Sequence, residues 1–294
     1  KLSETWAKSY SDVPYGEIFS KTQIEVYKES VFVGYRYYQK VKKQVAFPFG
    51  FGLSYTTFDY SDMKIEESGD SVTVNATITN TGNRFGAEIV QLYVKAPKTD
   101  VYKPEKELRG FTKVYLEAGE SKEVKIAINK ADLVYYNVKE KRYVTESGDY
   151  EFQLCSDCET VKLSETVTIT GENVSSPYGK DIFDIYEKSA DKVSDEAFEK
   201  MSGLKIPVLP PKRPITLESR FTDLRKTFMG RILYNAVLSV AKKDMKKALK
   251  LPEGAERDNK IKGAIFLKRI LESNSIITMS MSAGKSCPYH FAQG

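Results

Sequence analysis

Two neighbouring stretches decide how this chain is organised: Val33-Gly34-Tyr35-Arg36-Tyr37-Tyr38 and Phe47-Pro48-Phe49-Gly50-Phe51-Gly52-Leu53-Ser54-Tyr55-Thr56-Thr57-Phe58. Together they contain eight aromatic residues, three glycines and one proline. Glycine weakens strands, whereas large aromatic side chains favour burial, so this segment must turn tightly inside a packed interface. We interpret it as a junction between two domains.

Strand-like alternation of apolar and polar residues begins after Phe58. At residues 71–79 the side chains of Val72, Val74, Ala76 and Ile78 share one face. Similar segments follow at a spacing typical of a sandwich, separated by turns rich in Gly, Asn and Asp: residues 88–94, 108–116, 123–128, 150–154 and 161–169. The pattern predicts an antiparallel β-sandwich of about 110 residues, within residues 51–170.

The segments on either side of this sandwich lack a core of their own. Residues 1–50 combine turn signals with one short apolar patch at 31–38, so we expect them to be the end of a domain whose body is missing. Residues 171–215 lose all periodicity and end in Ile206-Pro-Val-Leu-Pro-Pro-Lys-Arg-Pro214. Such a composition favours extended, polyproline-like backbone, which predicts a linker laid against a surface.

Residues 216–294 show helical periodicity. Apolar residues between Phe221 and Leu249 recur at helical spacing, with Ser219 available as an N-cap and Asp223 in the first turn. Pro252 and Gly254 end this helix, and a second helical pattern runs over about 256–271. The sequence therefore predicts a helical extension whose apolar faces need a partner surface.

The net charge of +5 is unevenly distributed. Residues 212–294 hold 17 Lys and Arg against 7 Asp and Glu, whereas residues 1–211 hold 28 against 33. A basic helical segment can contact nucleic acid, anionic lipid or an acidic protein face, but a solvated or internally paired surface is the simpler interpretation. No motif mixing aromatic and basic residues indicates nucleic acid, and no apolar run approaches the roughly 18 to 20 residues of a membrane helix. We expect neither nucleic acid nor a membrane as a partner.

The cysteines give a weak indication of compartment and of metal binding. Three cysteines do not form a disulfide framework, which slightly favours a cytoplasmic over a secreted protein. They and the single histidine form two pairs with zinc-like spacing, Cys155-Ser-Asp-Cys158 and Cys287-Pro-Tyr-His290. Coincidence is the simpler interpretation, so no metal and no cofactor is predicted. The sequons at Asn75 and Asn173 matter only in a protein secreted by a eukaryote.

The junction resembles a known family. Tyr27-Lys-Glu-Ser-Val-Phe-Val-Gly-Tyr-Arg-Tyr-Tyr38 and the stretch 47–58 closely resemble the end of the second domain of family 3 glycoside hydrolases, the β-glucosidase-type enzymes. Lys106-Glu-Leu-Arg-Gly-Phe-Thr-Lys-Val114, Leu116-Glu-Ala-Gly-Glu-Ser-Lys-Glu-Val124 and Ser147-Gly-Asp-Tyr150 resemble the fibronectin type III-like domain that follows there, and Glu4-Thr5-Trp6 is similar to a stretch upstream. The resemblance covers residues 1 to about 170. It implies that residues 1–50 are the C-terminal tail of an α/β sandwich domain.

A second resemblance concerns the end of the chain. Met279-Ser-Met-Ser-Ala-Gly-Lys-Ser286, with Pro288-Tyr289 and Phe291-Ala-Gln-Gly294, is similar to the C-terminal extension of some bacterial members of the family. This implies a natural chain that continues past Gly294.

The resemblance also implies where the chemistry lies. Retaining glycoside hydrolysis needs two carboxyl groups about 5 to 5.5 Å apart. In the family, the nucleophile is an Asp of a (β/α)8 barrel and the acid/base is usually a Glu of the following sandwich domain, and both stretches precede the segments matched here. Glu29 and Glu107 are more simply interpreted as polar strand or loop residues, so we assign no catalytic residue.

The polar and aromatic residues of the junction have two interpretations. Arg36 can stack on aromatic faces or pair with a buried carboxylate, and it can also donate to sugar hydroxyls. Tyr35, Tyr37 and Tyr38 could form a sugar platform, but alternating aromatics on a short strand more often pack in a core and an interface. We favour packing for all four residues.

Two hypotheses of function remain. The first is the C-terminal portion of a β-glucosidase-like hydrolase, structural in itself, whose partners are the remaining barrel and sandwich domains and which meets carbohydrate only in the complete enzyme. The second is a non-catalytic carbohydrate- or protein-binding β-sandwich module. The sugar, the linkage and the oligomeric state stay open.

Overall fold

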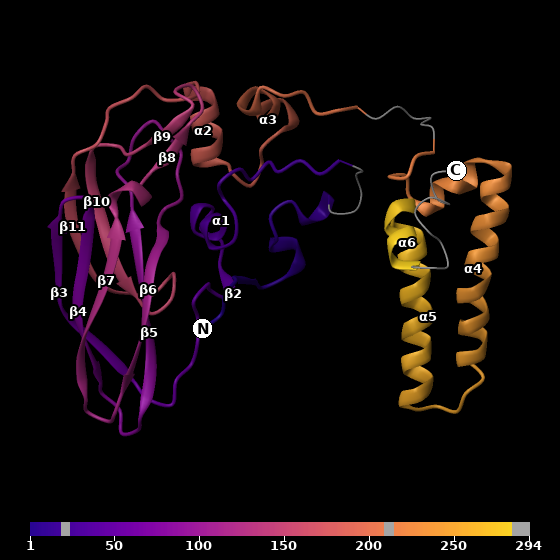
Figure 1. Cartoon of the computed structure of the whole chain (residues 1–294), viewed down its shortest axis with the longest axis horizontal. Helices are drawn as coiled ribbons and strands as arrows, with labels where there is room; N and C mark the ends of the chain where they lie inside the picture. Colours follow the sequence, from indigo (N-terminus) through magenta and orange to yellow (C-terminus); the bar gives the residue numbers. More distant parts are fainter. Residues whose placement is uncertain (19–23, 209–214, 284–294) are drawn as a thin grey trace. The chain divides into compact units, whose positions relative to one another are not determined.

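The computed structural model describes residues 1–18, 24–208 and 215–283. The chain divides into two compact units, Lys1–Pro207 and Val208–Gly294. Figure 1 labels the α-helices and most of the strands. The predicted end segment 284–294, with Cys287 and His290, lies outside the described residues.

The first unit contains the predicted β-sandwich (Figure 1). A three-stranded sheet has the order β3-β4-β7, and a four-stranded sheet has the order β11-β10-β5-β6. All neighbouring strands are antiparallel. Their bounds are β3 Phe58–Ser68, β4 Ser71–Asn80, β5 Gly86–Lys95, β6 Glu107–Leu116, β7 Ser121–Asn129, β10 Gly148–Cys155 and β11 Val161–Ile169. The six predicted strands are confirmed. The prediction missed β3, because a bulge between Ser61 and Lys64 interrupts its alternation.

The core of the sandwich lies between the two sheets. The face predicted for β4 is buried, with Val72, Val74, Ala76 and Ile78 each at most 1% exposed. It belongs to one hydrophobic cluster with residues of the four-stranded sheet, among them Leu92, Phe152 and Leu154. Burial of such side chains stabilises a fold by about 1.5–3 kcal/mol each.

A small hairpin precedes β10. It consists of β8 (Tyr135–Asn137) and β9 (Arg142–Val144), and the short 3-10 helix η3 (Lys130–Asp132) comes before it. Tyr136 lies opposite Tyr143 in this hairpin. Strands of three residues are too short for a recognisable period, so the sequence did not predict them.

The N-terminal segment forms short elements against the sandwich. They are β1 (Trp6–Ala7), η1 (Tyr10–Asp12), η2 (Gly16–Ile18), α1 (Tyr35–Lys40) and β2 (Val45–Phe47), and β1 pairs with β2. The expectation of a short strand at Tyr35, Tyr37 and Tyr38 is wrong. After Gly34, whose φ is 59°, the chain enters a helix. The helical turn places Tyr37 and Tyr38 in a hydrophobic cluster with Phe32. Tyr35 packs instead against a second cluster, formed by Tyr93, Cys155 and Cys158.

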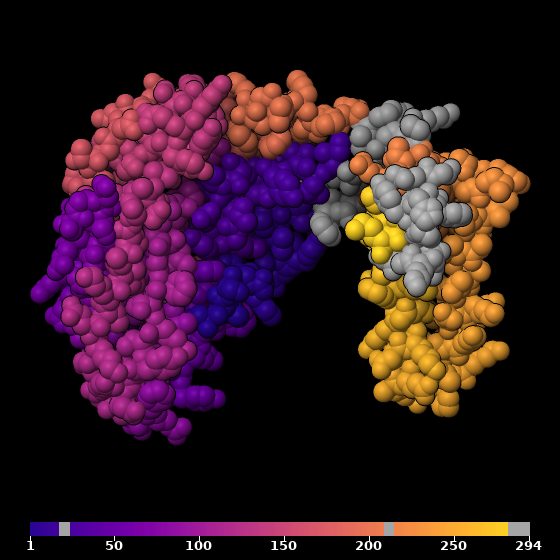
Figure 2. Space-filling view, viewed as in Figure 1, coloured from indigo at the N-terminus to yellow at the C-terminus, as the bar shows by residue number. Residues whose placement is uncertain are grey.

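The expectation of an extended linker over 171–215 is also wrong for its first part. Residues 180–188 form α2 (Lys180–Lys188) and residues 195–202 form α3 (Asp195–Ser202). Ile182 and Tyr186, four residues apart, share a face of α2 and pack with Phe32, Tyr37 and Tyr38. The two segments that lacked cores of their own therefore build a second core together, which Figure 2 shows as indigo and orange surfaces in contact within the first unit.

The second unit is helical. It contains η4 (Phe221–Lys226), α4 (Phe228–Ala248), α5 (Ala255–Ser273) and α6 (Ile276–Ala283). The expected start of the first helix is wrong: Thr227, not Ser219, caps α4 by accepting a hydrogen bond from the Gly230 N–H at 3.1 Å, and Asp223 lies in η4. Phe221, Tyr234, Leu238 and Leu271 form the core of this unit. Within the described residues, none of the helices is long and apolar enough to cross a membrane.

Candidate functional site

A cavity of about 410 Å³ opens in the first unit. Its walls come from β6, from the β8–β9 hairpin, from the loop after β5 and from segments near Ser30 and Pro177. Its size falls in the range of about 300–1,000 Å³ that is common for small-molecule sites. The charged residues that line it are Arg36, Lys103, Glu107, Arg109 and Glu146.

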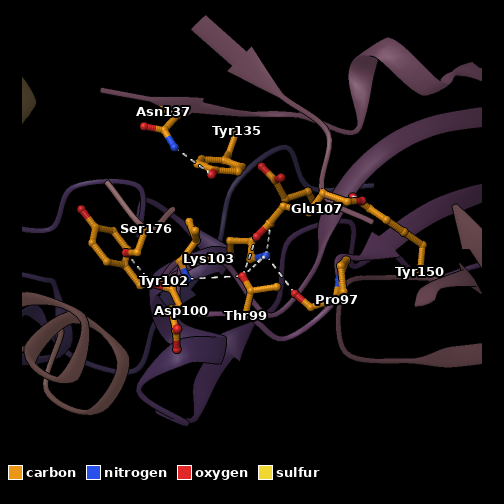
Figure 3. Close-up of polar contacts among 12 residues, drawn as sticks. Pro97, Thr99, Asp100, Tyr102, Lys103, Glu107, Tyr135, Asn137, Tyr150 and Ser176 are labelled. Carbon is orange, nitrogen blue, oxygen red and sulfur yellow. Dashed lines mark hydrogen bonds and ion pairs between the residues drawn. The ribbon is translucent and has the colours of Figure 1, made fainter. Parts of the chain in front are cut away.

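One ion pair is nearly buried at this cavity. The Lys103 ammonium pairs with the Glu146 carboxylate and also donates to the Pro97 carbonyl at 2.8 Å and the Thr99 hydroxyl at 3.0 Å (Figure 3). The Thr99 hydroxyl in turn donates to Glu146 at 2.6 Å. Burial lowers the pKa of Lys103, and the contact with Glu146 opposes this effect. All three ammonium protons have acceptors, so this network fixes the loop after β5 against the residues before β10.

A second ionic group involves Arg36. Its guanidinium lies 2.9 Å from Glu107 Oε1, and Arg109 lies 2.5 Å from the other oxygen, Oε2. The Arg36 Cζ atom also lies 5.9 Å from the centre of the Tyr35 ring. Arg36 therefore forms an ion pair with Glu107 and also contacts the Tyr35 ring. Glu107, the first residue of β6, forms ion pairs with both Arg36 and Arg109.

Tyrosines provide the aromatic part of the cavity wall. The Tyr102 ring stacks between the rings of Tyr178 and Tyr186, with both centroid distances at 4.6 Å. The Tyr150 hydroxyl donates to the Glu146 carbonyl at 2.9 Å, and burial raises the pKa of Tyr150 to about 12. Burial also raises the pKa of Tyr178, so these hydroxyls stay protonated even at a pH where an exposed tyrosine ionises.

The structure separates the three tyrosines of the junction. The Tyr35 ring lies 5.1 Å from Phe49 and 5.8 Å from Tyr93, while Tyr37 and Tyr38 are buried in the core shared with α2. They pack, as we favoured, and they do not present one common platform.

The first cysteine pair packs against aromatic residues of the junction, Tyr35 and Phe49. Cys155 ends β10, Cys158 follows in a turn, and both are free, buried thiols packed with Tyr93. Burial raises the pKa of Cys155 to about 11 and that of Cys158 to about 12. Across residues 1–18, 24–208 and 215–283, no group of three or more His, Cys, Asp or Glu side chains could hold a metal ion. The second pair, Cys287 and His290, lies outside these residues.

The remaining residues that the sequence singled out do not line the cavity. Glu29 lies in a turn before α1. Asn75 of the first sequon is 9% exposed within β4, whereas Asn173 of the second lies exposed in a loop. Of these two asparagines, only Asn173 is exposed in the folded chain.

The cavity is suited to binding more than to proton transfer. Its two carboxylates, Glu107 and Glu146, are each held by cationic side chains, whereas glycoside hydrolysis needs one carboxyl group that donates a proton. The sequence did not predict this cavity because its walls come from residues between 30 and 201 that only the fold brings together. The available signal was the group of tyrosines at 135, 136, 150 and 178.

Residues 88–158 match the family described as "Fibronectin type III-like domain". The chain is 44% identical over 162 residues to the probable beta-glucosidase I of Aspergillus oryzae, a match of 51% of this chain and 19% of that protein. It is 42% identical over 152 residues to an exo-alpha-(1->6)-L-arabinopyranosidase of Bifidobacterium breve. This match covers 51% of this chain and 20% of that protein. The structure of beta-glucosidase 3B from Thermotoga neapolitana matches with 40% identity and a TM-score of 0.54, over 57% of this chain and 24% of that one.

These matches cover only part of each protein. The chain spans about a fifth of the length of the two curated relatives. About half of the chain takes part in each match, and residues 88–158 are the part that matches the fibronectin type III-like family. This chain therefore contains a fibronectin type III-like domain and is homologous over about half its length to β-glucosidases, consistent with the C-terminal part of a family 3 glycoside hydrolase.

Proposed function

We propose that this chain is the C-terminal, non-catalytic portion of a β-glucosidase-like hydrolase that cleaves O-glycosidic bonds. In this proposal residues 1–50 complete an α/β sandwich domain, residues 51–170 form the fibronectin-like domain, and the chain braces the catalytic domains of the same enzyme. The predicted helical extension, residues 216–294, would add to this brace.

One observation carries the proposal: the junction is buried on one side and exposed on the other. Tyr37 is 3% exposed, whereas Leu53 is 91% and Tyr55 is 92% exposed. Exposed apolar side chains next to a packed interface mark a further contact surface. The β1–β2 sheet, with strands of two and three residues, is too short to be stable alone, which supports a larger sheet in the complete enzyme.

The absence of a catalytic pair in this portion follows from the same proposal. The carboxylates of the cavity are used in ion pairs with Lys103, Arg36 and Arg109. Catalytic carboxyl groups would lie in domains that precede the matched region. The sugar stays open, because the relatives are named for glucosides and for arabinopyranosides.

The first experiment compares two polypeptides: this chain and the product of the complete gene. Both are incubated with 4-nitrophenyl β-D-glucopyranoside and 4-nitrophenyl α-L-arabinopyranoside, and release of nitrophenol is measured. We expect the complete polypeptide to hydrolyse at least one substrate and this chain to hydrolyse neither. Hydrolysis by the chain alone, or by neither polypeptide, would contradict the proposal.

The bracing role has its own test. The substitutions Leu53→Asp and Tyr55→Asp place charge on the exposed side of the junction. We expect them to lower the melting temperature of the complete polypeptide, where these side chains would be buried, and to leave that of this chain unchanged. Leu204→Asp, also at an exposed apolar residue but away from the junction, is the matched control. Equal effects on both polypeptides would argue against bracing.

A further inference from the structure

We infer that the cavity beside β6 and the β8–β9 hairpin binds a small organic monoanion, in which a carboxylate is attached to an apolar body. The carboxylate would pair with Arg36 and Arg109, and the apolar body would cover the hydrophobic rim. The inference goes beyond the proposed bracing role and does not depend on it.

The charges of the cavity wall do not balance. Among the residues that line the cavity, Arg36, Lys103 and Arg109 are cationic, whereas only Glu107 and Glu146 are carboxylates. Lys103 is paired with Glu146 and has acceptors for all its ammonium protons. The excess positive charge therefore belongs to the two arginines, which share one carboxylate. A singly charged anion would neutralise the wall.

The two arginines also have few hydrogen-bond acceptors. A guanidinium has five N–H donors and can bind a carboxylate with two of them at once. The closest contacts with Glu107 use one terminal nitrogen of each arginine, at 2.9 Å for Arg36 and 2.5 Å for Arg109. In the part of the chain that the structure describes, the Nε atoms of both arginines are buried without a hydrogen-bond partner. Because buried donors without acceptors cost free energy, a second carboxylate that supplies acceptors to these groups is favoured.

Arg36 is the cation that a ligand would meet first. Its side chain is 37% exposed, whereas those of Arg109 and Lys103 are 22% and 16% exposed. The planar guanidinium matches the two oxygens of a carboxylate better than an ammonium does. The accessible cation of this wall is therefore of the kind that binds carboxylates.

The rim of the cavity is apolar. Val31, Tyr136 and Val138 line it and are 42%, 49% and 59% exposed. Leu133 and Tyr150, which also line it, are only 5% and 2% exposed. An organic body can remove the exposed side chains from water, which an inorganic anion cannot do. A mainly apolar wall with a few polar groups is typical of small-molecule sites.

Calorimetric titration of this chain with four compounds tests both parts of the inference. 4-Phenylbutanoate carries a carboxylate on an apolar body. 4-Phenylbutanamide has the same body without the charge, 4-phenylbutylamine has the opposite charge, and acetate lacks the apolar body. We expect 4-phenylbutanoate to bind at least about 10-fold more tightly than each of the other three compounds.

Variants of the wall should change binding in opposite directions. Arg36→Gln and Arg109→Gln each remove the excess positive charge, and each should weaken binding of 4-phenylbutanoate by about 10-fold or more. Glu107→Gln removes the competing carboxylate and leaves both arginines, so it should strengthen binding by about 2- to 10-fold. A site for a neutral ligand would not show this reversal.

The matched control is Arg257→Gln. Arg257 lies in α5, pairs with Glu253 at 3.3 Å and does not line the cavity. Its side chain is 25% exposed, close to the 22% of Arg109. This variant should bind like the unchanged chain. Thermal unfolding shows whether each variant is folded; if one arginine variant of the wall is not, the other decides, and if neither is, the ranking of the four compounds decides.

Four results would overturn the inference. They are no binding of 4-phenylbutanoate at tens of millimolar, equal binding of the amide, the amine or acetate, undiminished binding by the folded arginine variants of the wall, and an equal loss in Arg257→Gln. The proposed function is tested separately, by hydrolysis in the complete polypeptide. If the chain binds 4-phenylbutanoate but the complete polypeptide hydrolyses nothing, this inference is supported and the proposed function is contradicted. The reverse result would separate them equally well.

Discussion

The backbone N–H of Leu108 donates a hydrogen bond to the hydroxyl oxygen of Tyr35 at 2.9 Å. Tyr35 begins α1 and Leu108 lies in β6, so this bond joins the junction to the sandwich. The Tyr35 ring packs edge-on to Tyr93 of β5, and the Cys158 N–H donates to the Phe49 carbonyl at 2.9 Å. These contacts make the junction and the outer side of the four-stranded sheet one body.

The Tyr35 hydroxyl should contribute measurably to stability. Tyr35→Phe keeps the ring contacts and removes the acceptor of the Leu108 N–H, which leaves a half-buried donor without this partner. We expect the free energy of unfolding to fall by about 1–2 kcal/mol in urea titrations followed by circular dichroism. Tyr55→Phe, at an exposed tyrosine, should change it by less than about 0.5 kcal/mol. Equal effects would show that the hydrogen bond does not matter.

Gly50 should tolerate no side chain, for two separable reasons. Its φ is +82°, and an added Cβ would lie 2.2 Å from Gln91 Oε1. Gln91 is held in place because its amide donates to the Ser156 carbonyl at 2.7 Å. We expect Gly50→Ala to lower the free energy of unfolding by about 2–4 kcal/mol, the sum of backbone strain and overpacking.

Gly69 is the matched control for Gly50. Its φ is +56°, but nothing lies within 4 Å of an added Cβ. Gly69→Ala should therefore cost only the strain, about 1–2 kcal/mol. If the two variants lose the same stability, the contact with Gln91 does not constrain Gly50.

The buried thiols should be unreactive in the folded chain. Burial raises the pKa of Cys155 from 9.0 to about 11 and that of Cys158 to about 12. At pH 8 both remain protonated, and for Cys155 the thiolate fraction is about 100-fold below that of an exposed thiol. We expect iodoacetamide to leave both residues unmodified at pH 8 and to modify them in urea, as measured by peptide mass spectrometry. Labelling of the folded chain should begin only as the pH approaches 11, and rapid labelling at pH 8 would contradict the burial described here.

The same thiols make a zinc site unfavourable. Zinc binds thiolates, and these two cysteines are protonated and packed among aromatic rings. We expect the purified chain to contain no stoichiometric zinc and to keep its melting temperature in EDTA. If the chain instead holds one zinc ion, and the chelator removes both the zinc and part of the stability, the result would support a zinc site formed by Cys155, Cys158, Cys287 and His290.

The sequence predicted those parts of the fold that depend on local pattern. The buried face of β4 could be predicted because successive side chains of a strand point to opposite faces of the sheet. Its residues are Val72, Val74, Ala76 and Ile78. Alternating aromatic residues predict a short strand at Tyr35, Tyr37 and Tyr38, but here tertiary packing against α2 and the sandwich decides the conformation.

Long-range pairing explains the other differences. Tyr186 appears in the sequence as part of a polar segment, and only contact with Tyr102 and Phe32 gives its helix a core. The cavity is similar, because Arg36 and Glu107 are 71 positions apart in the sequence and meet only in the fold. No periodicity in either segment could have indicated that pair.

Two glycines of the helical unit should respond to alanine in opposite directions. An added Cβ at Gly263 in α5 meets nothing within 4 Å, whereas one at Gly230 in α4 would lie 2.2 Å from the Leu224 carbonyl and 2.6 Å from the Thr227 hydroxyl. Alanine stabilises an exposed helix interior by about 0.5–1 kcal/mol relative to glycine, so Gly263→Ala should raise the helical signal and the thermal midpoint of this unit. Gly230→Ala should lower both, because the turn of η4 and the Thr227 cap must move. If both variants stabilise the chain, helix propensity outweighs the cap, and the close approach of η4 to α4 does not restrict residue 230.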